Sequence, residues 1–207
     1  METNCSTDRD PVSPGEVPVI ILAGGKSRRM GRDKLALVIG GGTQTILESV
    51  VSRFEEEFDN VYISVADEAK YPEIKARRIV DIQPGAGPIS GLHATLTELP
   101  DDGVFLAAAD LPFACPRVAK RIIELSDGFD ACIIKLPDGK IEPLFGFYRR
   151  SVLPLCADAI NSGNNKMAGI IHNVNTRFIT PADLGQLWNG KLIMNINYPD
   201  DYERING

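Results

Sequence analysis

The 207-residue chain has few of the side chains from which disulfide frameworks and zinc centres are built. It contains four cysteines, which lie far apart with no Cys-x-x-Cys spacing, and only two histidines. These residues argue against a disulfide-stapled fold and against a zinc site. Buried or idle thiols are the expected state, and they are typical of a protein in the reducing cytoplasm.

Long apolar runs and an excess of positive charge are also missing. No apolar stretch approaches the roughly 20 residues that a membrane-spanning helix needs, so we expect no membrane partner. The formal net charge of −6 argues against a nucleic-acid partner, because phosphate-backbone affinity requires spread-out positive charge. The first sixteen residues lack the apolar core of a signal peptide. We expect residues 1–16 to be a disordered tail and residues 17–207 to form one domain.

The remaining sequence alternates between apolar strand-like segments and amphipathic helical segments. This alternation predicts an α/β fold, a three-layer sandwich with a mostly parallel central sheet covered on both faces. We also predict an extended piece over 35–39, a short helix over 68–74 and a last strand over 192–197. The main strands are expected at 17–23, 61–65, 78–82, 103–109, 131–135, 142–148 and 174–179, and the main helices at 45–58, 87–99, 116–125, 151–160 and 167–172.

The stretch that follows the first predicted strand has the composition of a polyphosphate site. Gly24 and Gly25 remove side chains where a backbone must turn or approach a ligand closely. Backbone N–H groups and nearby cations together suit phosphate oxygens. The alternative is a glycine turn with a solvated basic face. Five cations stand within nine residues: Lys26, Arg28, Arg29, Arg32 and Lys34.

This loop matches neither common phosphate-binding pattern. Gly25 and Gly31 have five residues between them and Arg32 follows, whereas a P-loop requires four residues and then Gly-Lys-Ser/Thr. The dinucleotide pattern Gly-x-Gly-x-x-Gly is absent as well.

Two aspartates end apolar strands. Asp110 follows the segment 104–109, which has no polar side chain, and at the carboxyl end of a parallel strand it would lie in the ligand crevice. A carboxylate there suits Mg²⁺; the alternative is that Asp110 only caps the helix after Pro112. Asp81 ends another strand and either contacts a nucleotide, supports the metal or acts as a structural cap.

Several other polar residues have two readings each. Asn195 and Asn197 would share a face of a strand and either bind a second substrate or end the strand and cap a helix at Pro199. Glu142 precedes Pro143 in an otherwise apolar stretch, and it likewise has either a functional or a structural role. Arg28 and Arg29 either contact phosphates or stay solvated, and His93 is expected to be a packing or helix-surface residue.

The pattern Leu-Ala-Gly-Gly-x-Ser-x-Arg-Met-Gly-x-Asp-Lys over 22–34 resembles the signature loop of nucleotidyltransferases, in particular of the molybdenum cofactor guanylyltransferase (MobA) family. Four further segments match this family in order, so the resemblance covers nearly all of 18–202. These segments are 80–81, 87–92, 109–113 and 195–199.

The resemblance implies a Rossmann-like fold of the nucleotide-diphospho-sugar transferase type and a set of site residues. Lys34 and Asp110 would be catalytic, with Asp110 binding Mg²⁺ as well as nucleotide. Asp81 would contact the guanosine, and the asparagines would lie on the pterin side. GTP would be bound by Leu22, Ala23, Gly24, Gly25, Lys34, Asp81 and Asp110.

The implied activity is Mg²⁺-dependent transfer of GMP from GTP to molybdenum-bound molybdopterin, with release of pyrophosphate. It proceeds by alignment and charge stabilisation, with no covalent enzyme intermediate. Proteins of molybdenum cofactor biosynthesis are the implied partners. The pair Gly24–Gly25 favours the guanylyl branch over the cytidylyl branch, which typically has Ala-Gly. Many relatives carry Asn near the position of Ser64, and the shorter serine leaves one ribose or base contact open.

Other functions remain compatible with the residues. One is a nucleotidyltransferase with another base or acceptor, such as a molybdopterin cytidylyltransferase or an enzyme acting on a phospholactate or sugar phosphate. Another is a non-catalytic nucleotide-binding regulator, since a fold alone does not separate these functions. The presence of both Lys34 and Asp110 argues against the regulator.

Overall fold

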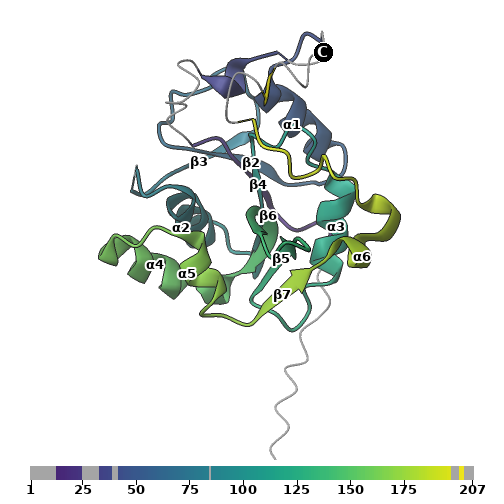
Figure 1. Ribbon diagram of the computed structural model, residues 1–207. Coiled ribbons are helices and arrows are strands. Elements are labelled where there is room, and N and C mark those ends of the chain that lie inside the picture. Colours follow the sequence, from purple (N-terminus) through teal and green to yellow (C-terminus); the bar gives the residue numbers. More distant parts are fainter. Residues whose placement is uncertain (1–12, 25–32, 39–41, 84, 197–200, 203–207) are drawn as a thin grey trace, which may run out of the picture.

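The computed structural model describes residues 13–24, 33–38, 42–83, 85–196 and 201–202. Its middle layer is a seven-stranded sheet with the strand order β3-β2-β1-β4-β6-β5-β7 (Figure 1). Four of the six neighbouring pairs are parallel, and β6 is antiparallel to both of its neighbours. The predicted α/β sandwich is confirmed. The strands are β1 (Val19–Leu22), β2 (Val61–Val65), β3 (Arg77–Val80), β4 (Gly103–Ala108), β5 (Ala131–Lys135), β6 (Ile141–Arg149) and β7 (Thr176–Ile179).

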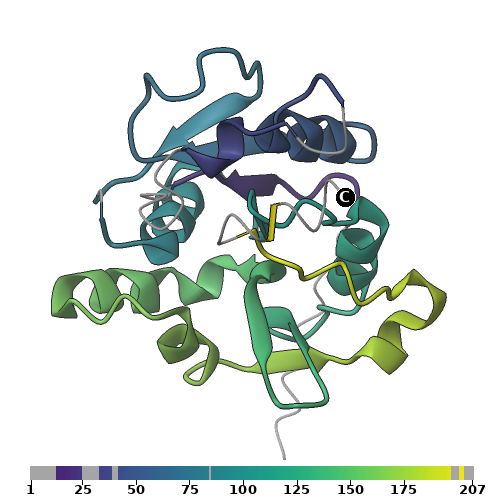
Figure 2. The same ribbon diagram turned by 45° about the horizontal axis from the view of Figure 1, so that its top comes forward.

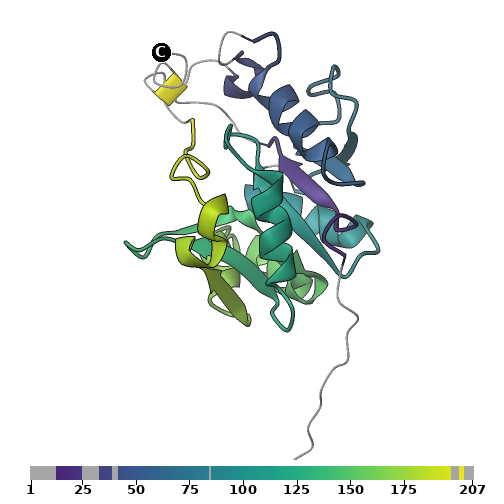
Figure 3. The same ribbon diagram turned by 90° about the vertical axis from the view of Figure 1, so that its right-hand side faces the viewer.

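Helices cover both faces of this sheet. Helices α1, α3 and α6 pack on one face, and α2, α4 and α5 pack on the other (Figures 1 and 3). Each face therefore has its own apolar cluster, as expected when burial on both sides is the main stabilising term. The helices are α1 (Ile46–Glu55), α2 (Pro88–Glu98), α3 (Pro116–Glu124), α4 (Leu153–Ser162), α5 (Met167–Ile171) and α6 (Pro181–Leu184), with short 3-10 turns η1 (Lys34–Ala36), η2 (Arg150–Val152) and η3 (Gly185–Leu187).

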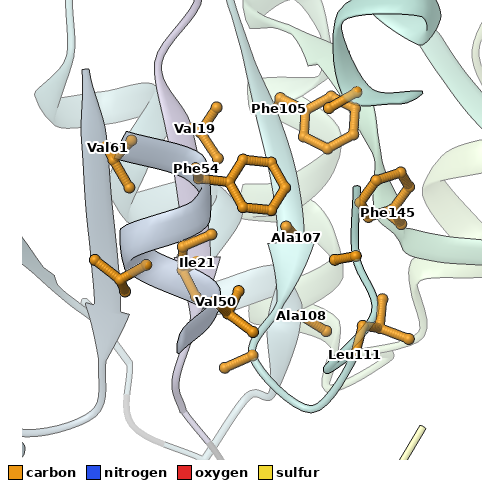
Figure 4. Packing of buried hydrophobic residues seen from close by; sticks show 14 of the residues in the cluster. Val19, Ile21, Val50, Phe54, Val61, Phe105, Ala107, Ala108, Leu111 and Phe145 are labelled. Atoms are coloured by element: carbon orange, nitrogen blue, oxygen red, sulfur yellow. The ribbon is translucent and has the colours of Figure 1, made fainter. Parts of the chain in front are cut away.

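Helix α1 shows how local sequence places an element on the sheet. Thr45 and Glu48 form a capping box, in which the Glu48 N–H donates to Thr45 Oγ1 and the Thr45 N–H donates to Glu48 Oε2. This reciprocal pair satisfies two backbone donors at the start of the helix. The apolar face then packs Val50 and Phe54 against the strand residues Ile21 and Ala107 (Figure 4).

Three predicted segments are wrong. The segment 35–39 begins as the 3-10 turn η1, with Val38 in an isolated bridge to Thr45. The segment 68–74 is a loop with turns, because Pro72 disfavours helical geometry at Tyr71, whose φ is +53°. The segment 192–196 is a turn followed by irregular backbone rather than a strand, and Ile196 donates its N–H to the carbonyl of Asp110.

The chain termini are described only in part. Residues 1–12 of the predicted tail lie outside the described residues, while Ser13–Glu16 form a turn whose Gly15 carbonyl accepts the N–H of Asp59. Of the helix expected after Tyr198, residues 201 and 202 are helical. Within the described ranges, no helix is long and apolar enough to cross a bilayer.

The strand register brings distant segments together at one edge of the sheet. Leu22 at the end of β1 lies opposite Ser64 of β2 and Ala108 of β4. Strand β1 has parallel neighbours on both sides: the chain continues from β1 to β2 on one side and later returns from β3 to β4 on the other. Open α/β sheets bind ligands at the point where the strand order reverses in this way. The residues that follow β1, β3 and β4 thus share one rim.

Candidate functional site

A cavity of about 720 Å³ opens at this rim. Its floor comes from the carboxyl ends of the parallel strands, and its walls come from the start of α2, from η1 and from the loop after β2. A cavity of this size suits a nucleotide-sized ligand. Among the residues that line it are Leu22, Gly24, Lys34, Ser64, Asp81 and Asp110.

Lys34 and Asp110 meet in this cavity although 76 positions separate them. Lys34 Nζ donates to Asp110 Oδ2 at 2.7 Å, and both side chains are mostly buried, at 16% and 24% exposure. Lys34 comes from η1, whereas Asp110 follows β4 by two residues. A cation and a carboxylate thus share the position where parallel strands end.

The backbone that follows Asp110 is held by hydrogen bonds from α1. Arg53 of α1 donates through Nη1 to the carbonyls of Pro112 at 2.8 Å and Ala114 at 2.9 Å. The helix that follows begins at Pro116 with Cys115 as its N-cap. The alternative that Asp110 merely caps this helix is therefore wrong.

The C-terminal segment crosses to the same place. The carbonyl of Ile196 accepts from Lys34 Nζ at 2.8 Å, and its N–H donates to the carbonyl of Asp110 at 3.0 Å. Figure 2 shows this segment, in yellow, leading back from α6 toward the middle of the molecule. Lys34 and Asp110 therefore contact the segment that carries Asn195.

Asp81 lies on the other side of the cavity, directly after β3. Its Oδ1 accepts a hydrogen bond from Ser64 Oγ at 2.9 Å. Burial raises the pKa of the Asp81 carboxyl, and the Ser64 hydroxyl partly opposes this shift. A Cβ at Gly24 would lie 3.5 Å from Asp81 Oδ2, so the β1 turn passes close to this carboxylate. The N-cap of the following helix is Gly87, with a φ of +70°, so Asp81 does not cap that helix.

The predicted loop residues are placed unequally. Leu22, Gly24 and Lys34 line the cavity. Ala23 is fully buried, and its N–H donates to the carbonyl of Ser64 at 2.9 Å. Gly25 lies outside the described residues, as do Arg28, Arg29 and Asn197.

Sequence reasoning missed the pairing of Glu142 with Asn195. Glu142 of β6 accepts the N–H of Leu144 at 3.0 Å and a hydrogen bond from the Asn195 side chain. Burial raises the pKa of the Glu142 carboxyl; the negative charge of Asp110 adds to the shift, and the hydrogen bonds oppose it. An acidic residue inside an apolar strand was the available signal, but only the fold identifies its partner.

Lys70 was also missed. It lines the cavity from the loop between β2 and β3. Its surroundings in the sequence are polar and carry no periodic pattern, so nothing in the sequence distinguished it from a solvated lysine. His93, expected on a helix surface or in packing, lies half-buried on α2.

The donor set at Asp110 fits one kind of metal site. Among the described residues, no group of three or more His, Cys, Asp or Glu side chains is arranged to hold a metal ion. Mg²⁺ is commonly bound through one or two carboxylates together with substrate phosphates and water. The Asp110 carboxylate, which lines the cavity, is compatible with that mode and not with an all-protein cage.

Known proteins resemble the chain over most of its length. The family model described as "MobA-like NTP transferase domain" matches residues 19–177. A probable molybdenum cofactor guanylyltransferase of Carboxydothermus hydrogenoformans is 31% identical over 188 residues, covering 90% of this chain and 93% of the relative. A protein of Methanosarcina mazei with the same description is 29% identical, covering 91% and 89%.

A solved structure agrees with these relatives. Molybdopterin-guanine dinucleotide biosynthesis protein A from Archaeoglobus fulgidus superposes with a TM-score of 0.81 at 27% identity, covering 92% of this chain and 97% of that one.

Proposed function

We propose, since the chain belongs to the family of MobA-like NTP transferase domains, that it transfers GMP from GTP to molybdenum-bound molybdopterin and releases pyrophosphate. Nucleotidyl transfer is the activity of this family and of its curated relatives. The observation that carries the proposal is the Lys34–Asp110 contact in a cavity that Gly24 also lines. A fold alone would not carry it.

The reaction needs alignment and charge stabilisation more than covalent chemistry. An oxygen of the acceptor's terminal phosphate attacks the α-phosphorus of GTP, and the bond between that phosphorus and the bridging oxygen of the departing pyrophosphate breaks. Lys34 offsets the negative charge that develops on the leaving group. No residue becomes covalently attached.

Asp110 is the residue that would hold Mg²⁺ in this scheme. When bound, Mg²⁺ neutralises part of the negative charge on the nucleotide phosphates. The partly exposed Asp110 carboxylate at the cavity wall, 24% accessible, supports this assignment.

The remaining roles divide the cavity between the two substrates. We assign residues 22–25 to GTP binding and Asp81 to the guanosine, which is supported by the position of Asp81 beside Gly24. Asn195, held by Glu142, belongs to the acceptor side. A cytoplasmic location and partner proteins of molybdenum cofactor biosynthesis complete the proposal. The location is supported by Cys115, Cys132 and Cys156, which are free thiols, as is usual in a reducing compartment.

A panel of nucleotides tests the proposal directly. The protein is incubated with Mg²⁺, molybdenum-bound molybdopterin and labelled GTP, CTP or ATP, and dinucleotide and pyrophosphate are measured. We expect transfer with GTP alone. Transfer with CTP would reassign the base, transfer only to another phosphate acceptor would reassign the second substrate, and no pyrophosphate release with any pair would favour a nucleotide-binding regulator.

Replacing Asp110 tests its assignment within this function. Asp110→Ala should abolish transfer and weaken the Mg²⁺ dependence of GTP binding, measured by calorimetry across a Mg²⁺ titration. Asp138→Ala is the matched control, because Asp138 pairs with Lys140 on the surface at 51% exposure. Turnover of Asp110→Ala that equals the control would remove Asp110 from the mechanism.

A further inference from the structure

The position of Lys34 depends on a very short element. Lys34 is the first residue of η1, which is only three residues long. Such a turn has little stability of its own and is placed by its caps. Asp33 is its N-cap, and Asp33 Oδ1 accepts the N–H of Leu35 at 3.1 Å. The direction in which Lys34 leaves the backbone is therefore set by the carboxylate of its neighbour.

The second oxygen of that carboxylate is held by a residue from another loop. Tyr71 donates its hydroxyl to Asp33 Oδ2 at 2.8 Å. The Tyr71 side chain belongs to the apolar cluster on the α1 face and is only 8% exposed. Burial, with the adjoining Asp33 charge, raises the pKa of the Tyr71 hydroxyl, so this donor keeps its proton.

The backbone of Tyr71 is strained. Its φ of +53° is the one positive value among the described residues other than glycine, and such a conformation costs roughly 1–3 kcal/mol. Arg78 of β3 maintains it by donating through Nη2 to the carbonyls of Tyr71 at 2.6 Å and Ile74 at 2.9 Å. Backbone strain of this kind clusters at functional sites, where the surrounding structure maintains it.

These contacts form one continuous path. It starts at β3, the strand that leads to Asp81, and runs from Arg78 through Tyr71 to Asp33 and Lys34. We propose that Tyr71 is a positioning residue: through Asp33 it aims the Lys34 ammonium and fixes it relative to the guanosine side of the cavity. The proposal rests on the proposed function for what Lys34 does, and on the geometry alone for what orients it.

A double-mutant cycle tests the path. The kcat for pyrophosphate release with GTP and molybdopterin, and the Kd for inorganic pyrophosphate, are measured for wild type, Tyr71→Phe, Lys34→Ala and the double variant. Tyr71→Phe should lower kcat about 10-fold, within the ~100-fold that a 1 Å displacement costs, and should weaken pyrophosphate binding. In the Lys34→Ala background the same change should alter either quantity by less than about twofold, because residues that act through each other are not additive.

Tyr62→Phe is the matched control. Tyr62 lies on β2 with 9% exposure, and its hydroxyl accepts from Arg77 Nη1 at 3.2 Å, outside the cavity lining. It should keep wild-type kcat and pyrophosphate affinity, and the melting temperatures of both variants show whether folding is affected.

Two results would overturn the role of Tyr71: wild-type kcat and affinity in Tyr71→Phe, or equal losses with and without Lys34. A wild-type protein that binds pyrophosphate but transfers no GMP would overturn the proposed function instead, and the binding measurements would still decide the role of Tyr71.

Discussion

At the scale of single residues, burial separates two lysine–aspartate pairs of similar geometry. Lys34–Asp110 and Lys140–Asp138 have N–O distances of 2.7 and 2.9 Å. The side chains of the first pair are 16% and 24% exposed, and those of the second are 79% and 51% exposed. An exposed pair is worth little because water screens it. The Lys34–Asp110 contact, partly shielded from water, gives the cavity a cation and a carboxylate at fixed positions.

Lys34→Ala should therefore reduce turnover by roughly 100-fold or more, because in the proposed reaction it removes the cation that stabilises the departing pyrophosphate. The measurement is kcat with GTP and molybdopterin at saturating Mg²⁺. Lys140→Ala is the control and should match wild type. A rate for Lys34→Ala within about twofold of wild type would show that the ammonium does not act in the transition state.

Glu142 gives a prediction about pH and stability. Burial raises its pKa above the ordinary 4.5, so the folded protein binds this proton more tightly than the unfolded chain. The cost of a buried carboxylate is then absent below pH 4.5, appears as the pH rises through the raised pKa, and is complete above it. In urea unfolding with EDTA, Glu142→Gln should gain stability relative to wild type as the pH rises above 4.5.

Glu57→Gln is the control with the opposite sign. The hydrogen bond from Lys120 lowers the pKa of the Glu57 carboxyl, so its contribution to stability is present above the ordinary pKa and is lost in acid. Relative to wild type, Glu57→Gln should therefore lose stability as the pH rises. A Glu142→Gln difference that is constant or falls with pH would contradict the assignment of a buried, proton-retaining carboxyl.

At the scale of elements, helix α2 approaches the sheet through a glycine. A Cβ at Gly91 would lie 2.5 Å from Ser64 Oγ, a distance that real Cβ contacts do not reach, and 3.0 Å from Leu22 Cδ2, which is tighter than most real contacts. Gly91→Ala should cost about 1–3 kcal/mol of unfolding free energy from overpacking. Because Ser64 is the donor to Asp81, this variant should also raise the KM for GTP more than it lowers kcat.

Gly169→Ala is the matched change in another helix. Its Cβ would meet Asn164 Nδ2 at 3.8 Å, an ordinary contact, so the variant should be neutral or more stable by up to about 1 kcal/mol from helix propensity. Equal stability and equal KM in both variants would show that the α2–β2 approach is looser than the structure indicates.

The elements that the sequence predicted well have a local cause. β2 and β5 were predicted with the bounds that the structure has, because continuous apolar runs with β-branched residues suit buried strands. The loop 68–74 was predicted as a helix because its polar sequence resembles that of an exposed helix. Pro72 disfavours helical geometry at Tyr71, and the hydrogen bond from Arg78 to the Tyr71 carbonyl holds the loop conformation. The segment 192–196 was missed because its backbone pairs with Asp110 and not with a strand.

At the scale of the whole molecule, the cavity draws on segments that span most of the chain. Gly24, Asp81 and Asp110 follow three different strands, and Lys34 belongs to a turn. A ligand that bridges them should stabilise the entire fold. At a GTP concentration of 100 times its Kd with Mg²⁺, the unfolding free energy should rise by about 2.7 kcal/mol, or roughly 5–10 °C in melting temperature.

Scanning calorimetry measures this shift, with CTP at the same concentration and Lys34→Ala as controls. Both controls should show a smaller shift than GTP with wild type. An equal shift with CTP would contradict guanine selection, and no shift with GTP would contradict nucleotide binding in this cavity.

The sequence by itself determined the α/β class, the strand-ending aspartates and the glycine-cation loop, because these are properties of neighbouring residues: apolar periodicity, charge and turn chemistry. Only the tertiary structure decided which of them meet. The contacts of Lys34 with Asp110 and Ile196, of Ser64 with Asp81, and of Tyr71 with Asp33 join residues that are 17 to 162 positions apart. Which residues meet depends on strand order and register. These arise from packing of the whole sheet, and a local sequence pattern does not encode them.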